Sequence, residues 1–142
     1  MSYSLAFSQA ILTVLFVADK VEQGYYDFMP TKELSASLNI ARPTAVKILG
    51  NLASAGIIET REGAKGGVRL AVAPADVTTL DVFEAIESGK PMFRNNFQLR
   101  VTGEKPTRAQ QAILTVLNEA EASMKARLAQ TTIADLMAVL NA

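Results

Sequence analysis

Residues 31–71 read TKELSASL, NIA, RPTAVKILGNLASAG, IIET, REGAKGG and VRLA, and this stretch decides the fold. The apolar spacing from Thr31 to Leu38 predicts a short helix. Asn39 to Ala41 then form a tight connection. A second helix is predicted from Arg42 to Ala55, because proline is tolerated in a first turn and Gly56 is a suitable stop. The stretch therefore begins as helix, short turn, helix.

The helix predicted from Arg42 to Ala55 has two different sides. Its buried stripe is expected to consist of Ala45, Ile48, Leu49 and Leu52. On the opposite side, Thr44, Lys47 and Asn51 follow i, i+3, i+7 spacing and form a polar ridge. Because Gly50 keeps this helix slim, the ridge has the shape and the chemistry to reach base edges in a major groove.

A β-hairpin with a glycine-rich tip follows the two helices. Strands are predicted at Ile57–Thr60 and at Val68–Ala71, with a turn from Arg61 to Gly67 between them. Lys65 and the adjacent Gly66 and Gly67 would let a cation and backbone amides approach a phosphate or enter a minor groove. The hairpin is therefore expected to be the wing of a winged helix.

Helical patterns account for most of the remaining chain. They are predicted at Leu5–Gln23, Thr79–Ser88 and Arg108–Gln130. A capping box at Thr132–Asp135 begins a last short helix, which carries the apolar residues Ile133, Leu136 and Leu140. The expected fold class is mainly α with a small β-hairpin: a winged helix-turn-helix followed by a long C-terminal helix. We expect residues 1–89 to form the winged-helix domain and residues 90–142 to form a connecting loop, the long helix and the short last helix.

The long helix has an apolar seam in steps of three and four residues. The seam consists of Ile113, Leu117, Ala120, Met124 and Leu128. It could pack within the chain on the first helix, or against its twin in a second subunit. About twenty residues at ~1.5 Å each span ~30 Å, which is more than a small domain can cover. Dimerisation is therefore the favoured interpretation.

The composition removes several classes of function. The chain has no cysteine and no histidine, so it lacks thiolate and imidazole metal ligands and the usual nucleophiles and general bases of enzymes. No glycine-rich phosphate loop and no paired-carboxylate pattern appears, which makes an enzyme improbable. The apolar run Ala10–Ala18 is too short to span a bilayer, and we interpret it as a core helix. A cytoplasmic protein without membrane contact is expected.

Charge is divided along the chain although the total is zero. From Arg42 to Arg69 there are five basic and two acidic residues, a net of +3, whereas Asp76 to Glu87 carries four acids and no base. Such a division suits a half that faces DNA and a half that faces outward. The alternative is a helical core whose charged outer face is merely solvated.

The candidate DNA-binding residues lie on the predicted recognition helix, on the wing and at the N-terminus. They are Ser4, Arg42, Pro43, Thr44, Lys47, Asn51, Arg61, Lys65, Gly66, Gly67 and Arg69. Double-stranded DNA and a second copy of the chain are the expected partners, and no cofactor or metal is expected.

Five ordered stretches carry a family pattern. They are Leu34…Leu38-Asn-Ile40, Ile48-Leu49…Leu52…Ala55-Gly56-Ile57-Ile58, Gly63-Ala-Lys-Gly66-Gly67-Val-Arg-Leu70, Val77-Thr-Thr-Leu80-Asp-Val82…Ala85-Ile86 and Thr132-Ile-Ala-Asp-Leu136. The pattern resembles the Rrf2 family of bacterial winged-helix regulators, which includes IscR, NsrR and CymR. The resemblance covers nearly the whole chain, and the Gly-Gly wing followed by Thr-Leu-Asp-Val is its most specific part.

The resemblance implies a homodimer on a pseudo-palindromic operator, with Ala41–Lys47 in the major groove and the wing, Gly63–Arg69, in the minor groove. Glu62, Val68 and Ala41 depart from the arginine, tyrosine and serine that the family often has at these places. Members that bind a cluster have three cysteines between the fourth helix and the dimerisation helix. The corresponding window, residues 89–107, has none, which excludes a thiolate-held iron–sulphur cluster.

Three questions stay open on sequence alone. The protein could be a repressor or an activator, with a small molecule, a partner protein or no effector as its signal. The basic window from Lys90 to Arg108 could line an anion site between subunits, or it could be a solvated loop. A winged-helix module that binds proteins and has lost specific DNA binding is the alternative function.

Overall fold

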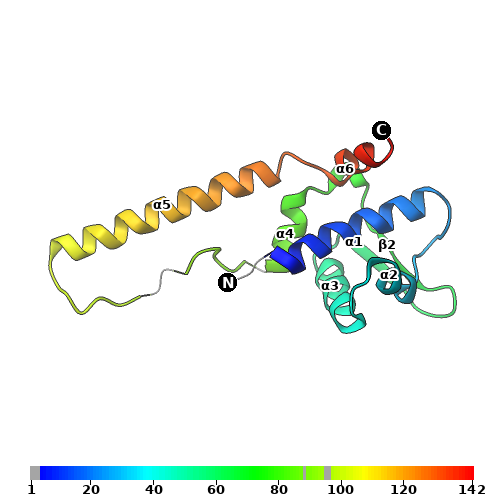
Figure 1. Ribbon diagram of the computed structural model, residues 1–142, viewed down its shortest axis with the longest axis horizontal. Coiled ribbons are helices and arrows are strands. Elements are labelled where there is room, and N and C mark those ends of the chain that lie inside the picture. Colours follow the sequence, from blue (N-terminus) through cyan, green and yellow to red (C-terminus); the bar gives the residue numbers. More distant parts are fainter. Residues whose placement is uncertain (1–3, 88, 95–96) are drawn as a thin grey trace.

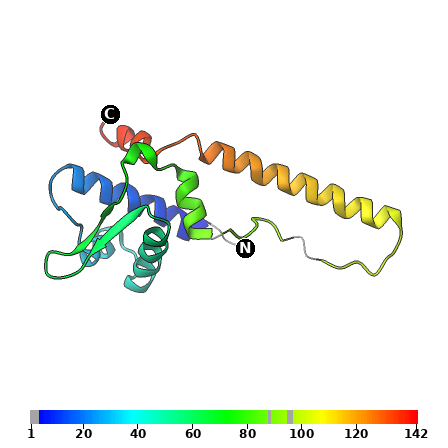
Figure 2. The same cartoon turned by 180° about the vertical axis from the view of Figure 1, so that it is seen from behind.

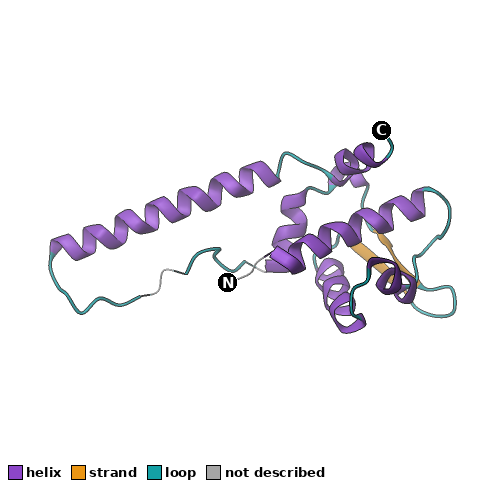
Figure 3. Ribbon diagram, in the orientation of Figure 1, coloured by secondary structure: helices purple, strands orange, loops and turns teal. Residues whose placement is uncertain are grey.

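The computed structural model describes residues 4–87, 89–94 and 97–142 (Figure 1). Its elements in chain order are α1 (Ser4–Glu22), α2 (Thr31–Leu38), α3 (Arg42–Ser54), β1 (Ile58–Arg61), β2 (Gly67–Leu70), the short 3-10 helix η1 (Pro74–Asp76), α4 (Thr79–Glu87), α5 (Glu104–Leu128) and α6 (Ile133–Leu140). Helices predominate, and β1 and β2 form a two-stranded antiparallel sheet (Figure 3). The predicted fold class is confirmed.

α1 is the central helix of the body. In both views α2 and α3 lie on one side of it and α6 on the other (Figures 1 and 2). Its predicted apolar run is a core segment, since Ala10, Val14 and Val17 are fully buried. No helix in the described part of the chain has both the length and the apolar character needed to cross a bilayer.

Leu34 of α2, Leu52 of α3, Val68 of β2, Val82 of α4 and Ile133 of α6 pack into the same core, at 2% exposure or less. One apolar cluster therefore joins the helix-turn-helix, the wing and the C-terminal helix.

The boundaries of the strands and of the long helix differ from the predicted ones. β1 begins and ends one residue later than predicted, and β2 begins and ends one residue earlier. Both strands are therefore closer to the turn, because the last pair of the ladder is Arg61 with Gly67. The long helix begins at Glu104, four residues before the predicted start, directly after Gly103 with φ +122°. The predicted end of the fourth helix, Ser88, lies outside the described residues.

The last helix begins at the predicted capping box, but its buried residues differ in part from the predicted ones. The Thr132 hydroxyl accepts a hydrogen bond from the Asp135 amide (3.0 Å), and the Asp135 carboxylate accepts one from the Thr132 amide (2.9 Å). Of the three apolar residues predicted for this helix, Ile133 is buried and Leu136 is half-buried against the core, whereas Leu140 in the final turn is 54% exposed. Met137 fills the core position instead, four residues after Ile133 on the same face.

The C-terminal helix α6 returns to the N-terminal body after the long helix. The Ile133 amide donates to the carbonyl of Val77 (2.8 Å), and the Thr79 amide donates to the carbonyl of Thr131 (2.9 Å). α6 thus completes the core around α1 and η1. The division into residues 1–89 and 90–142 stays a prediction.

The wing is hydrogen-bonded to the segment that precedes α2. The Met29 amide donates to the carbonyl of Val68 (2.7 Å), and the Val68 amide donates to the carbonyl of Met29 (2.9 Å). Gly67 makes this approach possible, because its φ is +151° and a Cβ there would overlap the carbonyl group of Met29. A Cβ at Gly66 would overlap the carbonyl of Arg61. Both wing glycines therefore have a steric role within the fold.

We expect Gly67→Ala to destabilise the protein by at least about 2 kcal/mol, since both the backbone angle and the Met29 contact oppose a side chain. Gly50→Ala is the matched control. Gly50 is helical and has open space around the position of a Cβ, so alanine should stabilise α3 by up to about 1 kcal/mol. Urea unfolding followed by circular dichroism measures both, and equal stabilities would contradict the steric role of Gly67.

Candidate nucleic-acid interface

The turn between α2 and α3 fixes how α3 leaves the body. Asn39 takes the left-handed conformation with φ 52° at the end of α2, and the Ser35 hydroxyl donates to the carbonyl of Ile40 (2.6 Å). Ile40 is buried at 5% exposure. The predicted buried stripe of α3 is confirmed, since Ala45, Ile48, Leu49 and Leu52 are all buried. The rest of α3 is consequently held outward.

The outward side of α3 is less polar than the sequence predicts. Thr44 and Lys47 are exposed, but Asn51 is half-buried. Val46 is 55% exposed and lies roughly 160° around the helix from Thr44, at ~100° per residue. Gly50, one turn after Val46, is exposed and leaves open space. The predicted ridge therefore occupies one flank of the helix, and an apolar strip occupies the other.

An open groove of about 720 Å³ separates α3 from the wing. Arg42, Val46 and Gly50 line it on the helix side, and Thr60 and Val68 line it on the wing side. Lys32, from the first turn of α2, also borders it. Arg61 and Glu62 line it as well. The groove thus combines apolar side chains with three basic residues and one acidic residue.

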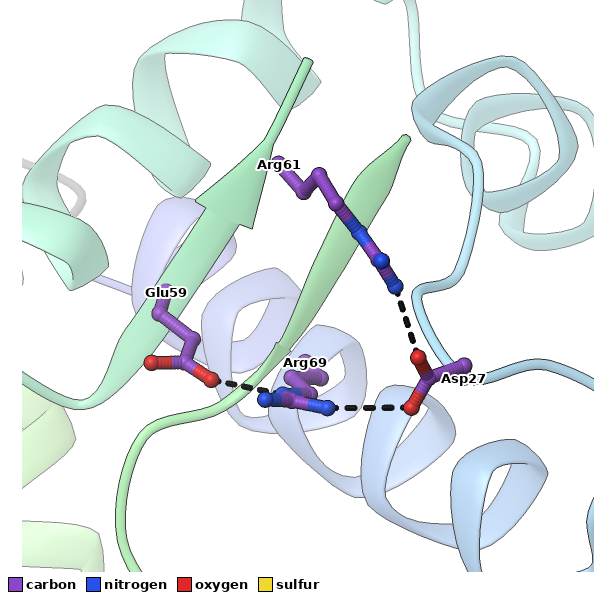
Figure 4. A network of polar contacts seen from close by, with 4 residues as sticks. All are labelled: Asp27, Glu59, Arg61 and Arg69. Carbon is purple, nitrogen blue, oxygen red and sulfur yellow. Dashed lines mark hydrogen bonds and ion pairs between the residues drawn. The ribbon is translucent and has the colours of Figure 1, made fainter. Parts of the chain in front are cut away.

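The two wing arginines form an ion-pair network (Figure 4). Arg61 Nη2 lies 2.6 Å from the Asp27 carboxylate, and Arg69 Nη1 lies 2.9 Å from its other oxygen. Arg69 Nε is 2.6 Å from the Glu59 carboxylate. Strand alternation explains the cluster, because Glu59, Arg61 and Arg69 project from one face of the hairpin and Thr60 and Val68 from the other.

Phe28 supports both guanidinium groups of this network. The Arg61 guanidinium carbon lies 4.0 Å from the centre of the Phe28 ring, and that of Arg69 lies 4.2 Å from it. The hydrogen bond with Glu59, followed by the charges of Glu59 and Asp27, raises the pKa of Arg69 above its usual value. Arg69 accordingly stays cationic at every physiological pH while its charge is locally balanced.

The network changes the charge division expected from the sequence. The count of +3 over residues 42–69 omits Asp27, which lies outside that stretch and reaches both arginines. Two carboxylates balance Arg61 and Arg69, so the arginine-bearing face of the wing is neutral. Arg42, Lys47 and Lys65 are exposed and make no ion pair with other described residues, and the same holds for Lys32 beside the groove. These four residues supply the unbalanced positive charge of the candidate surface. The role of each residue in DNA binding stays a prediction.

Pro43 and Ser4 are the remaining predicted DNA-binding residues. Pro43 is exposed in the first turn of α3, beside Arg42. Ser4 begins α1, but its side chain lies outside the described residues.

The predicted dimerisation helix projects from the body. α5 runs away from α4 and α6 as an arm in both views (Figures 1 and 2). None of its 25 residues, all of which the structure describes, is buried. Within the predicted seam, Ile113 and Ala120 are exposed, and Leu117, Met124 and Leu128 are half-buried. Leu114 (39% exposed) and Val116 (63%) add further exposed apolar surface.

Polar contacts attach the base of this arm. The Lys125 ammonium lies 3.2 Å from the Glu84 carboxylate, and the Glu121 carboxylate accepts a hydrogen bond from the Met92 amide (2.5 Å). The Thr79 hydroxyl donates to the carbonyl of Leu128 (2.5 Å). Sequence reasoning missed these contacts, because the partners lie 29 to 49 residues apart.

The Rrf2 family model, described as an iron-dependent transcriptional regulator, matches residues 3–139. The chain belongs to the Rrf2 family. Members of this family are transcription regulators and not enzymes, so the winged body and its projecting helix belong to a regulator. A search among curated proteins gives no significant match.

Solved Rrf2-type structures share the fold. IscR of T. potens is 16% identical, with a TM-score of 0.70, and the match covers 99% of this chain and 88% of that one. CymR, the global cysteine regulator of B. subtilis, is 19% identical with a TM-score of 0.67 over 98% of both chains. The oxidized form of CymR from Staphylococcus aureus is 19% identical, with a TM-score of 0.66 over 96% of both chains.

The donor set of this Rrf2 chain does not suit an iron site. Iron–sulphur clusters are held by thiolates, with imidazole as the usual replacement, and the chain has neither group. Among the described residues, no group of three or more acidic side chains is placed to hold a metal ion. The segment between α4 and α5 carries Lys90, Arg94 and Arg100 instead, which would repel a cation.

We expect Asp27→Asn to strengthen binding to double-stranded DNA about fivefold at low salt and to steepen the salt dependence by about one ion. The physical reason is that the substitution leaves two wing cations without their shared counter-charge. Fluorescence anisotropy across a salt series measures both quantities. Asp19→Asn is the matched control, because it removes the same charge from a carboxylate of α1 that accepts a hydrogen bond from Gln23 and pairs with neither wing arginine. An affinity unchanged from the unaltered protein would contradict this prediction.

Proposed function

We propose that the protein is a DNA-binding transcription regulator that acts as a homodimer on a pseudo-palindromic operator. The supporting observation is the outward side of α3, which is slim at Gly50 and is flanked by the unpaired cations Arg42 and Lys47. A major groove about 12 Å wide admits a helix of this kind, and cations beside it neutralise phosphates. α3 would enter the major groove, and the wing tip with Lys65 would reach the neighbouring minor groove.

The exposed arm α5 supports the proposal of a homodimer. A helix of 25 residues spans ~37 Å, and apolar side chains such as Ile113 and Val116 are unfavourable in water without a partner. A second α5 packed along the seam would cover them. The twofold symmetry of such a dimer would place two α3 helices on two half-sites of a palindrome.

The regulator would work without an iron–sulphur cluster, since it has no thiolate to bind one. We expect a cytoplasmic protein whose signal is a small molecule, a partner protein or its own abundance. Repression is the simplest outcome of a dimer that occupies an operator.

The neutral wing favours one other function. Arg61 and Arg69 are balanced by Asp27 and Glu59, as in a winged-helix module that binds a protein instead of DNA. Retention of a partner protein together with the absence of DNA binding at low salt would favour this alternative.

The proposal predicts specific binding to the DNA upstream of the protein's own gene. Lys47→Ala should weaken that binding about tenfold and, if Lys47 contacts a phosphate, should reduce the salt slope by about one. Arg127→Ala, which removes one charge from the last turn of α5 and leaves α3 and the wing unchanged, is the control. Gel shift and anisotropy give these values. Absence of any specific shift by the unaltered protein at low salt would contradict DNA-binding regulation.

Substitutions in α5 test the dimer separately from DNA binding. Ile113→Glu places a charge in the seam, so we expect sedimentation velocity to show a monomer where the unaltered protein is a dimer, with operator affinity lowered at least tenfold. Gln111→Glu, on the opposite side of α5, should remain dimeric. A monomeric unaltered protein, or a dimeric Ile113→Glu variant, would count against the seam.

A further inference from the structure

Val46 is the large apolar side chain of α3 that lies outside the core. Ile48, Leu49 and Leu52 of the same helix are at most 5% exposed, whereas Val46 is 55% exposed. It faces the groove between α3 and the wing. Single exposed valines are common on protein surfaces, so its exposure alone would not indicate a function. Its position on α3 distinguishes it.

Val46 shares its side of the groove with a basic residue and with an open position of the helix. Arg42 precedes Val46 by one turn and Gly50 follows it by one turn, which places all three on one side of the helix. A Cβ at Gly50 would meet no atom within 4 Å, so this place is open. Arg42 and Lys47 supply positive charge on the two flanks, and Pro43 extends the apolar strip toward the start of α3.

The chemistry of the major groove restricts what this side of α3 can contact. Adenine, guanine and cytosine present hydrogen-bonding groups there, and thymine alone adds a methyl group at C5. An aliphatic side chain over the polar edges would exclude water from them without replacing its hydrogen bonds. Contact with the thymine methyl buries two apolar groups and leaves no polar group unsatisfied.

We propose that Val46 selects a thymine in each half-site by packing against its C5 methyl group. This inference rests on the proposed function and deepens it, because it names the base that the apolar side of α3 recognises. Gly50 would allow the helix to approach that base closely, and Arg42 and Lys47 would hold the flanking phosphates. Thr44 and Asn51 on the other flank would then have a secondary part in specificity.

The test begins with selection of binding sites by the purified full-length protein from random duplex DNA. A symmetric site with at least one strongly preferred thymine per half-site is expected. Each preferred thymine is then replaced by uracil, which removes the methyl group and keeps every hydrogen-bonding group. At one of these positions the affinity of the unaltered protein should fall about fourfold, the effect of one buried methyl group.

The same replacement is measured with Val46→Ala, which is expected to fold because the position is exposed and alanine favours helix. For this variant the thymine and uracil duplexes should bind equally, because the side chain that contacts the methyl group has been shortened. The difference between the two proteins is the coupling that a double-mutant cycle measures. Val139→Ala removes the same atoms from an exposed valine of α6 and should keep the fourfold difference. Circular dichroism confirms that both variants are folded.

The outcomes separate this inference from the function on which it rests. A selected site in which no uracil replacement weakens binding, or a Val46→Ala variant with the full fourfold difference, would overturn the role of Val46 and leave DNA regulation intact. Failure of the unaltered protein to select any sequence would overturn both.

Discussion

The pair of hydrogen bonds between Met29 and Val68 is the constraint on which the candidate interface depends. It joins the strand β2 to the segment before α2, and so connects the wing to the helix-turn-helix. Gly67 is required at this contact, since any side chain would overlap the Met29 carbonyl group. Val68 makes this contact, is buried and also lines the groove beside α3, so the wing side of the groove is hydrogen-bonded to the segment before the helix-turn-helix.

The same contact determines the charge of the wing. By fixing Met29 it also fixes Asp27 and Phe28, which meet Arg61 and Arg69 on the outer face of the hairpin. Exposed ion pairs of this kind contribute little stability, roughly 0–1 kcal/mol each. Their larger effect is electrostatic, because they cancel two cations near a surface proposed to bind DNA. Attraction to phosphates would then rest mainly on α3 and on Lys65 at the wing tip.

Local patterns predicted most of the fold, and long-range contacts account for what they missed. The bounds of α2, the buried stripe of α3 and the capping box of α6 follow from spacings within one or two turns, and all three are confirmed. Asp27 meets Arg61 and Arg69 across 34 and 42 residues, and no local pattern reports such a pairing. The ridge from Thr44 to Asn51 shows the same limit. Helical periodicity identified the side away from the core, but the wing distinguishes one flank of that side from the other.

Within its own chain, α5 is held mainly by contacts at its base. Lys125 pairs with Glu84, and Glu121 accepts a hydrogen bond from the Met92 amide. The contacts of α5 with the rest of its own chain are therefore largely polar and partly exposed. Contacts of this kind fix a direction less firmly than a buried apolar core does. In the proposed dimer the missing apolar contacts come from the second α5. The partner would then determine the angle of each arm, and with it the separation of the two α3 helices along DNA. Dimer stability and operator spacing would consequently be properties of the same seam.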